Sequence, residues 1–323
     1  MRFQPRVMRA CLSLVLSLLM AGMAAPTFAA APFQNQQAPG YYRFHLGHFE
    51  ITALNDGTFP MPVGKLLKDV SESELNAALQ RSFLSDPIDA SVNGFLINTG
   101  SKLVLIDTGT GGSMGPSVGR LVQNLVASGY QPAQVDEIYI THMHGDHIGG
   151  LSRDGHAVFP NAILRIARSE ADYWLDAAKR DSAPAEVRGS FDNAATALAP
   201  YIDAHHFVKF NDDADLVDGI HARAAHGHTP GHTVYVVTSD HQSLLVWGDL
   251  MHVASVQFPN PAVTIGFDSD RASALKQRQD IFAEIAHKGM WAAGAHLPFP
   301  GIGHLRPSGN GYDFQPINYQ AAF

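Results

Sequence analysis

One short stretch, Ile138-Tyr-Ile-Thr-His142-Met-His144-Gly-Asp146-His147, constrains the fold of this chain more than any other. Its apolar, β-branched beginning is typical of a buried strand, and three imidazoles and one carboxylate follow within six residues. Such side chains bind Zn²⁺, Mn²⁺, Fe²⁺ or Co²⁺, and no cysteine lies here to form a thiolate site. In an extended turn, His142 and His144 point to one side, while Asp146 and His147 can turn to another. The pattern therefore predicts a loop that serves two neighbouring metal ions, rather than a polar surface turn.

The first 30 residues differ in composition from the rest of the chain. Three arginines precede an apolar run over residues 10–20, and small residues follow up to residue 31. This is the pattern of a secretory signal peptide, and it is too short for a retained membrane span. We therefore expect residues 1–30 to be cleaved and residues 31–40 to form a flexible arm. The mature protein would be periplasmic or secreted, without stable membrane association.

Cysteine usage and charge narrow the classes of function. The only cysteine, Cys11, lies in the predicted leader, so the mature chain would have neither a thiol nor a disulfide. Three of the 22 basic residues and none of the 30 acidic ones lie in that leader, which changes the net charge from −8 to −11. An acidic chain without a Lys/Arg run argues against nucleic acid or an anionic membrane as a partner.

Residues 41–323 contain no Pro/Ser-rich linker and no fixed repeat, which predicts a single domain. Alternating residues predict a hairpin over residues 41–54, which Asn55-Asp-Gly57 would end. Ser71 opens a capping box for a short helix, and Pro116 starts another helix that ends before Gly129. Further strands are predicted over residues 92–98, 102–106, 138–141, 162–167, 207–210, 220–225, 233–238, 243–247 and 290–293.

The C-terminal half adds two helical predictions. Ser169 would cap a short helix, and a longer one spans residues 269–287 with Gly289 as its stop. Residues 180–200 are polar and weakly periodic, which favours short helices and loops in a flap over a site. The Pro/Gly-rich tail after His296 is predicted to be irregular. The alternation of helices and strands indicates an α/β fold with a mixed sheet flanked by helices.

Three further metal-ligand candidates stand at the ends of predicted strands. His228 lies in a Gly/Pro turn between two strands, Asp249 closes the strand over 243–247, and His296 follows the last strand. Alone, each has an ordinary explanation as a turn residue or a helix cap. With the first cluster they complete the set that two adjacent ions need: His142, His144, Asp146, His147, His228, Asp249 and His296.

In its order and spacing, this series resembles the ligands of the metallo-β-lactamase-fold hydrolases. The upstream sequence Leu105-Ile-Asp107-Thr-Gly109 is also similar to the first motif of that superfamily. Three runs, over residues 40–57, 131–144 and 295–304, look closer still like the bacterial methyl parathion hydrolases, a family of organophosphorus hydrolases. The resemblance implies a four-layer αββα sandwich of two mixed sheets with the metals at one edge. It also suggests a homodimer.

The resemblance further implies how the ligands divide between the ions. His142, His144 and His228 would bind one ion, Asp146, His147 and His296 the other, and Asp249 would bridge both. We expect Zn²⁺, although Mn²⁺, Co²⁺ and Fe²⁺ suit the same ligands. Two adjacent ions can share a hydroxide and polarise the bond that it attacks, so no side-chain nucleophile is required. The two carboxylates, Asp146 and Asp249, are the candidate catalytic residues.

Other side chains near the motifs are candidates for supporting roles. Asp107 and His232 are predicted to orient ligand imidazoles, with turn stabilisation as the alternative. His226 and His252 have no assigned partner, but His252 stands where the resembled family is apolar and could line the pocket. The aromatic cluster around the leaving group in methyl parathion hydrolases matches Met114, Trp174 and Phe191. Met114 departs from the family's Phe, and core packing is the alternative explanation for Trp174, as loop packing is for Phe191.

These observations predict a secreted two-metal hydrolase that cleaves organophosphate triesters with aryl leaving groups by a metal-bridging hydroxide. The alternative is an arylesterase or lactonase that acts at carbonyl carbon with the same metals, since the ligand set does not separate the two. A metal-storage protein without catalysis conflicts with so complete a ligand set. A nuclease conflicts with the acidic charge, and a β-lactamase with the closer resemblance. For both the phosphotriesterase and the esterase or lactonase alternative, the expected partner is a small-molecule ester.

Overall fold

The computed structural model describes residues 31–321, and the predicted leader lies outside them. Contacts divide the chain into Met1–Ala38 and Pro39–Phe323, and the following description concerns the second unit. Residues 31–40 form no helix or strand. In the part of the chain that the structure describes, no helix combines the length and apolar character needed to cross a membrane.

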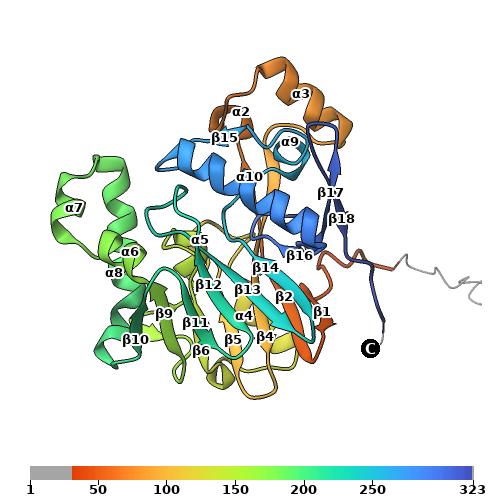
Figure 1. The fold of residues 1–323 in the computed structure, drawn as a ribbon. Helices are drawn as coiled ribbons and strands as arrows, with labels where there is room; N and C mark the ends of the chain where they lie inside the picture. The colour runs from red at the N-terminus through yellow and green to blue at the C-terminus, as the bar shows by residue number, and fades with distance from the viewer. Residues whose placement is uncertain (1–30, 322–323) are drawn as a thin grey trace, which may run out of the picture. The chain divides into compact units, whose positions relative to one another are not determined.

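Seven strands form the first sheet, in the order β1-β2-β4-β5-β6-β9-β10 (Figure 1). The pairs from β1 to β5 are antiparallel, and those from β5 to β10 are parallel. The sheet is therefore mixed, as predicted. Its strands are β1 (Tyr41–Leu46), β2 (Phe49–Met61), β4 (Ile88–Asn98), β5 (Leu103–Ile106), β6 (Glu137–Tyr139), β9 (Ile163–Ala167) and β10 (Phe207–Phe210).

The second sheet has the order β11-β12-β13-β14-β16-β17-β18. Only its β14–β16 pair is parallel. Its strands are β11 (Ala214–Val217), β12 (Ile220–Ala224), β13 (Thr233–Ser239), β14 (Gln242–Val246), β16 (Trp291–Ala293), β17 (Ile302–Ser308) and β18 (Gly311–Pro316). Two minor pairs are β3 (Leu67–Lys68) with β15 (Thr264–Ile265), and β7 (Ser152–Arg153) with β8 (His156–Ala157).

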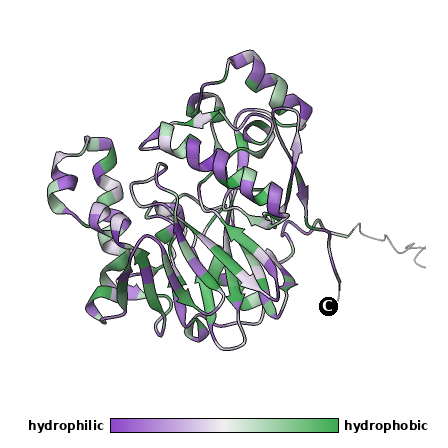
Figure 2. Cartoon of the chain, in the orientation of Figure 1, coloured by the Kyte–Doolittle hydropathy of each residue, from purple (hydrophilic) through white to green (hydrophobic). Residues whose placement is uncertain are grey.

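Helices cover the outer faces of both sheets. Phe95 of the first sheet and Tyr235 of the second lie in one buried cluster between the sheets. A second cluster packs α8 on the first sheet, and a third packs α10 on the second. Figure 2 shows apolar residues concentrated on the strands. The helices are α2 (Val63–Leu66), α3 (Glu72–Arg81), α4 (Leu121–Ala127), η1 (Pro132–Gln134), α5 (Gly145–Ile148), α6 (Arg168–Trp174), α7 (Ala177–Ser182), α8 (Ala185–Asp203), α9 (Ala254–Gln257) and α10 (Arg271–Lys288). The predicted αββα layering is confirmed.

Local signals predicted two helix ends correctly. The Ser71 side chain accepts a hydrogen bond from the Glu74 N–H, and the Glu74 carboxylate accepts one from the Ser71 N–H, so the capping box of α3 is formed. Helix α10 ends at Gly289, whose φ of 63° is a left-handed conformation that glycine adopts without strain.

The prediction that β2 ends at Asn55-Asp-Gly57 is wrong. The strand continues to Met61 through a bulge between Asn55 and Gly57. At the bulge, the buried Asp56 carboxylate accepts hydrogen bonds from Thr110, Gly119 and Leu121. The bond from the Leu121 N–H, at 3.0 Å, caps α4 from another element. Helix α4 therefore begins at Leu121, and not at Pro116 as predicted.

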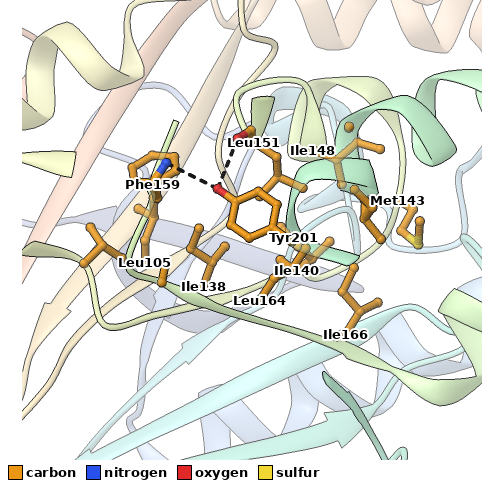
Figure 3. Packing of buried hydrophobic residues seen from close by; sticks show 14 of the residues in the cluster. Leu105, Ile138, Ile140, Met143, Ile148, Leu151, Phe159, Leu164, Ile166 and Tyr201 are labelled. Atoms are coloured by element: carbon orange, nitrogen blue, oxygen red, sulfur yellow. Dashed lines mark hydrogen bonds between the residues drawn. The ribbon is translucent and has the colours of Figure 1, made fainter. Parts of the chain in front are cut away.

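Three further predictions fail in the C-terminal half. Helix α6 begins at Arg168, and the Ser169 hydroxyl donates to Asp212 instead of capping it. The prediction of short helices and loops over residues 180–200 holds at its start, where the short helix α7 ends at Ser182, but fails beyond it. Residues 185–203 form the single helix α8, because its apolar residues recur on one face and pack on the first sheet. The Tyr201 hydroxyl on that face donates to the Leu151 carbonyl and accepts from the Phe159 N–H (Figure 3). The tail is also regular, since β17 and β18 form a hairpin with Gly309 in its turn.

Candidate metal centre

The polar turns of both sheets meet at one edge. The His142 loop follows β6, while His228, Asp249 and His296 follow β12, β14 and β16. Strands β14 and β16 are parallel neighbours, and β12 runs in the same direction because two antiparallel pairings separate it from β14. Their carboxyl ends therefore lie at the same edge of the second sheet, facing the end of β6.

The structure brings the seven candidate ligands into two groups that share Asp249. Within each group, one potential ligand atom per residue lies within 4.8 Å of the others. These groups have the composition that the family resemblance implies. The first contains His142, His144, His228 and Asp249, and the second contains Asp146, His147, Asp249 and His296.

Asp249 lies between the groups with one oxygen toward each. Its Oδ2 is 3.6 Å from His142 Nε2 and 3.3 Å from His228 Nε2. Its Oδ1 is 3.1 Å from Nε2 of both His147 and His296. This is the geometry of a carboxylate that can ligate two cations at once.

The buried atoms of the centre fit cations better than they fit one another. Nε2 of His147 and Oδ1 of Asp249 are buried without a hydrogen-bond partner, although they lie 3.1 Å apart. A buried polar atom without a partner costs free energy, and a cation between the two would satisfy both. The nitrogen and oxygen ligands suit Zn²⁺ and related divalent ions.

Burial and carboxylate charge shift the pKa values of the imidazoles in opposite directions across the centre. Burial holds the pKa of His142 well below its ordinary value and lowers the pKa of His144 to about 3. Burial acts in the same direction on His228 and His296, but neighbouring carboxylates outweigh it. Asp249 with Asp268 raises the pKa of His228 to about 9, and Asp249 with Asp146 raises the pKa of His296 to about 10. Cation binding at neutral pH must therefore displace protons from these two imidazoles.

Carboxylates outside the two groups orient two of the ligand imidazoles. Asp107 Oδ2 is 2.8 Å from His147 Nδ1, and Asp107 also accepts hydrogen bonds from the Thr141 N–H and hydroxyl. Asp268 Oδ1 is 3.0 Å from His228 Nδ1. Such contacts fix the tautomer and the ring angle of a ligand histidine.

His232 and Asp268 differ from what the sequence suggested. His232 contacts no ligand imidazole through a hydrogen bond, and its Nε2 instead accepts one from the Asp249 N–H at 3.1 Å. It therefore holds the backbone of the shared carboxylate. Asp268 was not predicted. The only sequence signal was its place two residues before Asp270, the N-cap of α10.

A cavity of about 280 Å³ opens onto both groups. Its walls combine candidate ligands with apolar side chains. Among the described residues, no Lys or Arg lines it. An uncharged substrate suits such walls, because most of a ligand's contacts in a pocket are apolar. The lining residues are Phe59, Met114, His144, Gly145, Asp146, Ser190, Asp249, His252, Phe267 and His296.

Of the three predicted pocket residues, only Met114 lines this cavity. Trp174 and Phe191 are buried in the core of the first sheet, where their rings pack 4.7 Å apart between α6 and α8. The aromatic walls are instead Phe59, on the part of β2 beyond its predicted end, and Phe267, in the loop before α10. The Trp174 ring still forms a T-shaped contact with the His144 ring, with centroids 5.6 Å apart.

His252 is an eighth side chain at the centre. It is buried, its Nε2 is 3.0 Å from Asp249 Oδ2, and its ring stacks on His296 with centroids 5.1 Å apart. It also lines the cavity, so the suggestion from the sequence that it faces the pocket agrees with its position. His226 lies outside both groups, near Asp212.

Comparisons with known proteins agree with this site. Residues 88–288 match the family model of the metallo-beta-lactamase superfamily. An N-acyl homoserine lactonase of Bacillus sp. is 23% identical over 241 residues, covering 68% of this chain and 86% of the relative. One of Bacillus thuringiensis subsp. kurstaki is 24% identical over 242 residues, with the same coverage of both chains.

Two solved structures are similar over most of the chain. The hydrolase AbOPH of the beta lactamase superfamily superposes with a TM-score of 0.84 at 37% identity, covering 88% of this chain and 100% of that one. The dizinc quorum-quenching lactonase AidC, in complex with the product N-hexanoyl-L-homoserine, gives a TM-score of 0.81 at 27% identity, covering 87% and 98%. With the αββα layers and the two His/Asp groups, these matches show that the chain belongs to the metallo-beta-lactamase superfamily, as a dinuclear-metal hydrolase.

Proposed function

We propose that this protein hydrolyses lactones, with N-acyl homoserine lactones as the leading class. The carrying observation is the cavity, which joins both ligand groups to apolar walls and has no Lys or Arg among its described lining residues. Such a cavity suits a neutral ester with an apolar chain. The lactonases among the relatives support the choice of lactone. We therefore prefer the alternative of carbonyl esters to the phosphotriesters that the sequence analysis placed first.

The proposed centre holds two divalent ions, with zinc as the leading identity because AidC is described as dizinc. His142, His144 and His228 would hold one ion, Asp146, His147 and His296 the other, and Asp249 both. When bound, the ions supply a water of lowered pKa and polarise the ester carbonyl. Asp249 keeps the groups at a fixed separation, and Asp107 holds the His147 ring.

Asp146 is the best-placed residue for proton transfer. It lines the cavity, and its Oδ2 is 3.4 Å from His296 Nε2. Opening a lactone releases an alkoxide, which needs a proton, whereas a phenolate needs little protonation. Asp146 can take the proton of the attacking water at its carboxylate and give it to the alkoxide oxygen. Phe59, Met114 and Phe267 would bind the acyl chain.

The second candidate is hydrolysis of aryl phosphotriesters, and the aromatic walls Phe59 and Phe267 favour it because they can stack on an aryl leaving group. Parallel assays of the zinc-loaded protein decide between the two. We expect kcat/KM for an N-acyl homoserine lactone to exceed that for an aryl phosphotriester by at least about 100-fold, a discrimination within reach of pocket contacts. A preference of that size for the phosphotriester would contradict the proposal.

We also propose export and self-association. The first 30 residues support a periplasmic or secreted location, which fractionation of cells that produce the full chain would test by the compartment and the mature N-terminus. The family resemblance supports a homodimer, and light scattering of the purified protein would test it by the molar mass.

A further inference from the structure

Glu170, near the start of α6, is fully buried and accepts four hydrogen bonds. Its Oε1 receives the Met143 N–H at 2.7 Å and the Trp174 Nε1–H at 2.8 Å. Its Oε2 receives the Thr229 hydroxyl at 2.7 Å and the Gly231 N–H at 2.8 Å. Three of the partners are N–H groups, which can only donate, and the Thr229 hydroxyl donates as well, so Glu170 is the acceptor in all four contacts.

Three of these donors come from the segments that carry the first ligand group, and the fourth, Trp174, lies on α6 itself. Met143 stands between His142 and His144 in the loop after β6, while Thr229 directly follows His228 in the turn after β12. The loop belongs to the first sheet and the turn to the second. Glu170 therefore connects the two segments whose imidazoles must converge on one ion.

The packing around Glu170 leaves no room for a side chain at Gly231. A Cβ added at Gly231 would lie 2.1 Å from the Glu170 nitrogen and 2.5 Å from its Cα, so the turn packs directly on the backbone of α6. Trp174, one turn further along α6, donates to Glu170, and its ring forms a T-shaped contact with the His144 ring. One helix thus fixes both segments and one ligand ring.

The second group is held differently. Asp107 accepts hydrogen bonds from Thr141 and lies 2.8 Å from His147 Nδ1, whereas none of the hydrogen bonds of Glu170 in the described structure involves a ligand of that group. We propose that Glu170 is a positioning residue for one ion only, the one bound by His142, His144, His228 and Asp249. This inference rests on the proposed two-ion centre and not on the choice of substrate.

The test is the substitution Glu170→Gln, which keeps the shape but presents amide N–H groups to some of the four donors. Loss of an outer partner typically costs 10–100-fold in metal affinity. We therefore expect one of two Co²⁺ equivalents to bind about 10–100-fold more weakly in chelator competition, with loss of the absorption bands of that site, while the other equivalent binds as in the wild type.

The matched control is Glu137→Gln. Glu137 is a buried carboxylate on β6 that accepts hydrogen bonds from Tyr139 and Arg165, and neither partner belongs to the two ligand groups. The Glu137→Gln variant should have a lower melting temperature but should bind both Co²⁺ equivalents with the affinities of the wild type. Thr229→Val removes one donor to Glu170 and serves if Glu170→Gln does not fold. It should weaken the same equivalent to a smaller degree.

Several outcomes would overturn the inference. Wild-type affinity for both equivalents in Glu170→Gln, or in Thr229→Val if the first does not fold, would show that the contacts do not position the ion. An equal loss of both equivalents would indicate general destabilisation. A wild-type protein that binds fewer than two equivalents would contradict the two-ion centre itself. A wild-type protein that binds two equivalents but does not hydrolyse lactones would contradict only the choice of substrate.

Discussion

At the scale of single residues, Asp249 determines the charge balance of the centre. Each of its oxygens faces the imidazoles of one group, and in the absence of cations this carboxylate raises the pKa of His228 and His296. His142 and His144 have lowered pKa values because they are buried among other imidazoles. The same cluster therefore holds protonated and neutral imidazoles side by side. As a result, the free energy of unfolding depends on pH.

We predict that the metal-depleted protein is most stable near pH 6.5. Below that pH, the unfolded chain takes up protons at His142 and His144 that the folded state cannot bind, so stability falls with decreasing pH. Above it, the folded state retains protons at His228 and His296 that the unfolded chain has lost. The stability they contribute therefore disappears as pH rises through about 9 and about 10. Thermal melts from pH 5 to 10 check this, and a melting temperature that rises steadily to pH 10 would refute it.

A second prediction concerns the shared ligand. Asp249→Ala should remove one bound metal equivalent and lower kcat/KM by more than about 100-fold, the upper end of what losing an outer partner costs. His147→Ala should act in the same way on the second group. His226→Ala is the control, because this imidazole lies outside both groups and should leave metal content and turnover unchanged. Full turnover in either ligand variant would exclude its assignment.

At the scale of elements, the Asp56 bulge connects β2 to the loop over residues 108–121. The carboxylate accepts from Thr110, Gly119 and Leu121, and so provides the N-terminal cap that α4 lacks in its own sequence. The same loop contains Met114, which lines the cavity. A single buried carboxylate thus fixes both a helix start and one cavity wall.

Asp56→Ala should lower the free energy of unfolding by about 2–5 kcal/mol, because several buried donors lose their acceptor at once. Denaturant titration measures the change. The control is Asp89→Ala, an exposed position on β4, for which we expect a change within about 0.5 kcal/mol. If the two variants unfolded alike, the bulge would not have the proposed structural role.

The sequence predicts elements well where the signal is local, and poorly where a distant partner decides. The Ser71 capping box and the Gly289 stop act within one turn, and both predictions are confirmed. The start of α4 depends on Asp56, more than 60 positions upstream, so Pro116 alone was misleading. The β17–β18 hairpin was missed because its Pro/Gly content masked the alternation.

The same distinction applies to the site. The ligand turns follow strands whose carboxyl ends meet, so sequence order was enough to single out all seven side chains that converge. The cavity walls could not be deduced in this way. Whether Trp174 or Phe59 faces the cavity depends on how α6 and β2 pack, which no periodicity in either segment reveals.

At the scale of the whole molecule, the two ions would connect the sheets. The first sheet supplies the His142 loop, and the second supplies His228, Asp249 and His296. A ligand that binds only the folded state stabilises it by mass action, with about 2.7 kcal/mol at a concentration 100 times the Kd. Metal loading should therefore raise the melting temperature, and substrate turnover should depend on the same event.

Stepwise loading of the metal-depleted protein tests the central claim most directly. Zn²⁺ is added in fractions of an equivalent while hydrolysis of an N-acyl homoserine lactone is followed. Because each group has its own ligands and Asp249 completes both, we predict that activity rises to its plateau only as the second equivalent binds. Full lactone hydrolysis with one equivalent, or none after two are bound, would contradict the account.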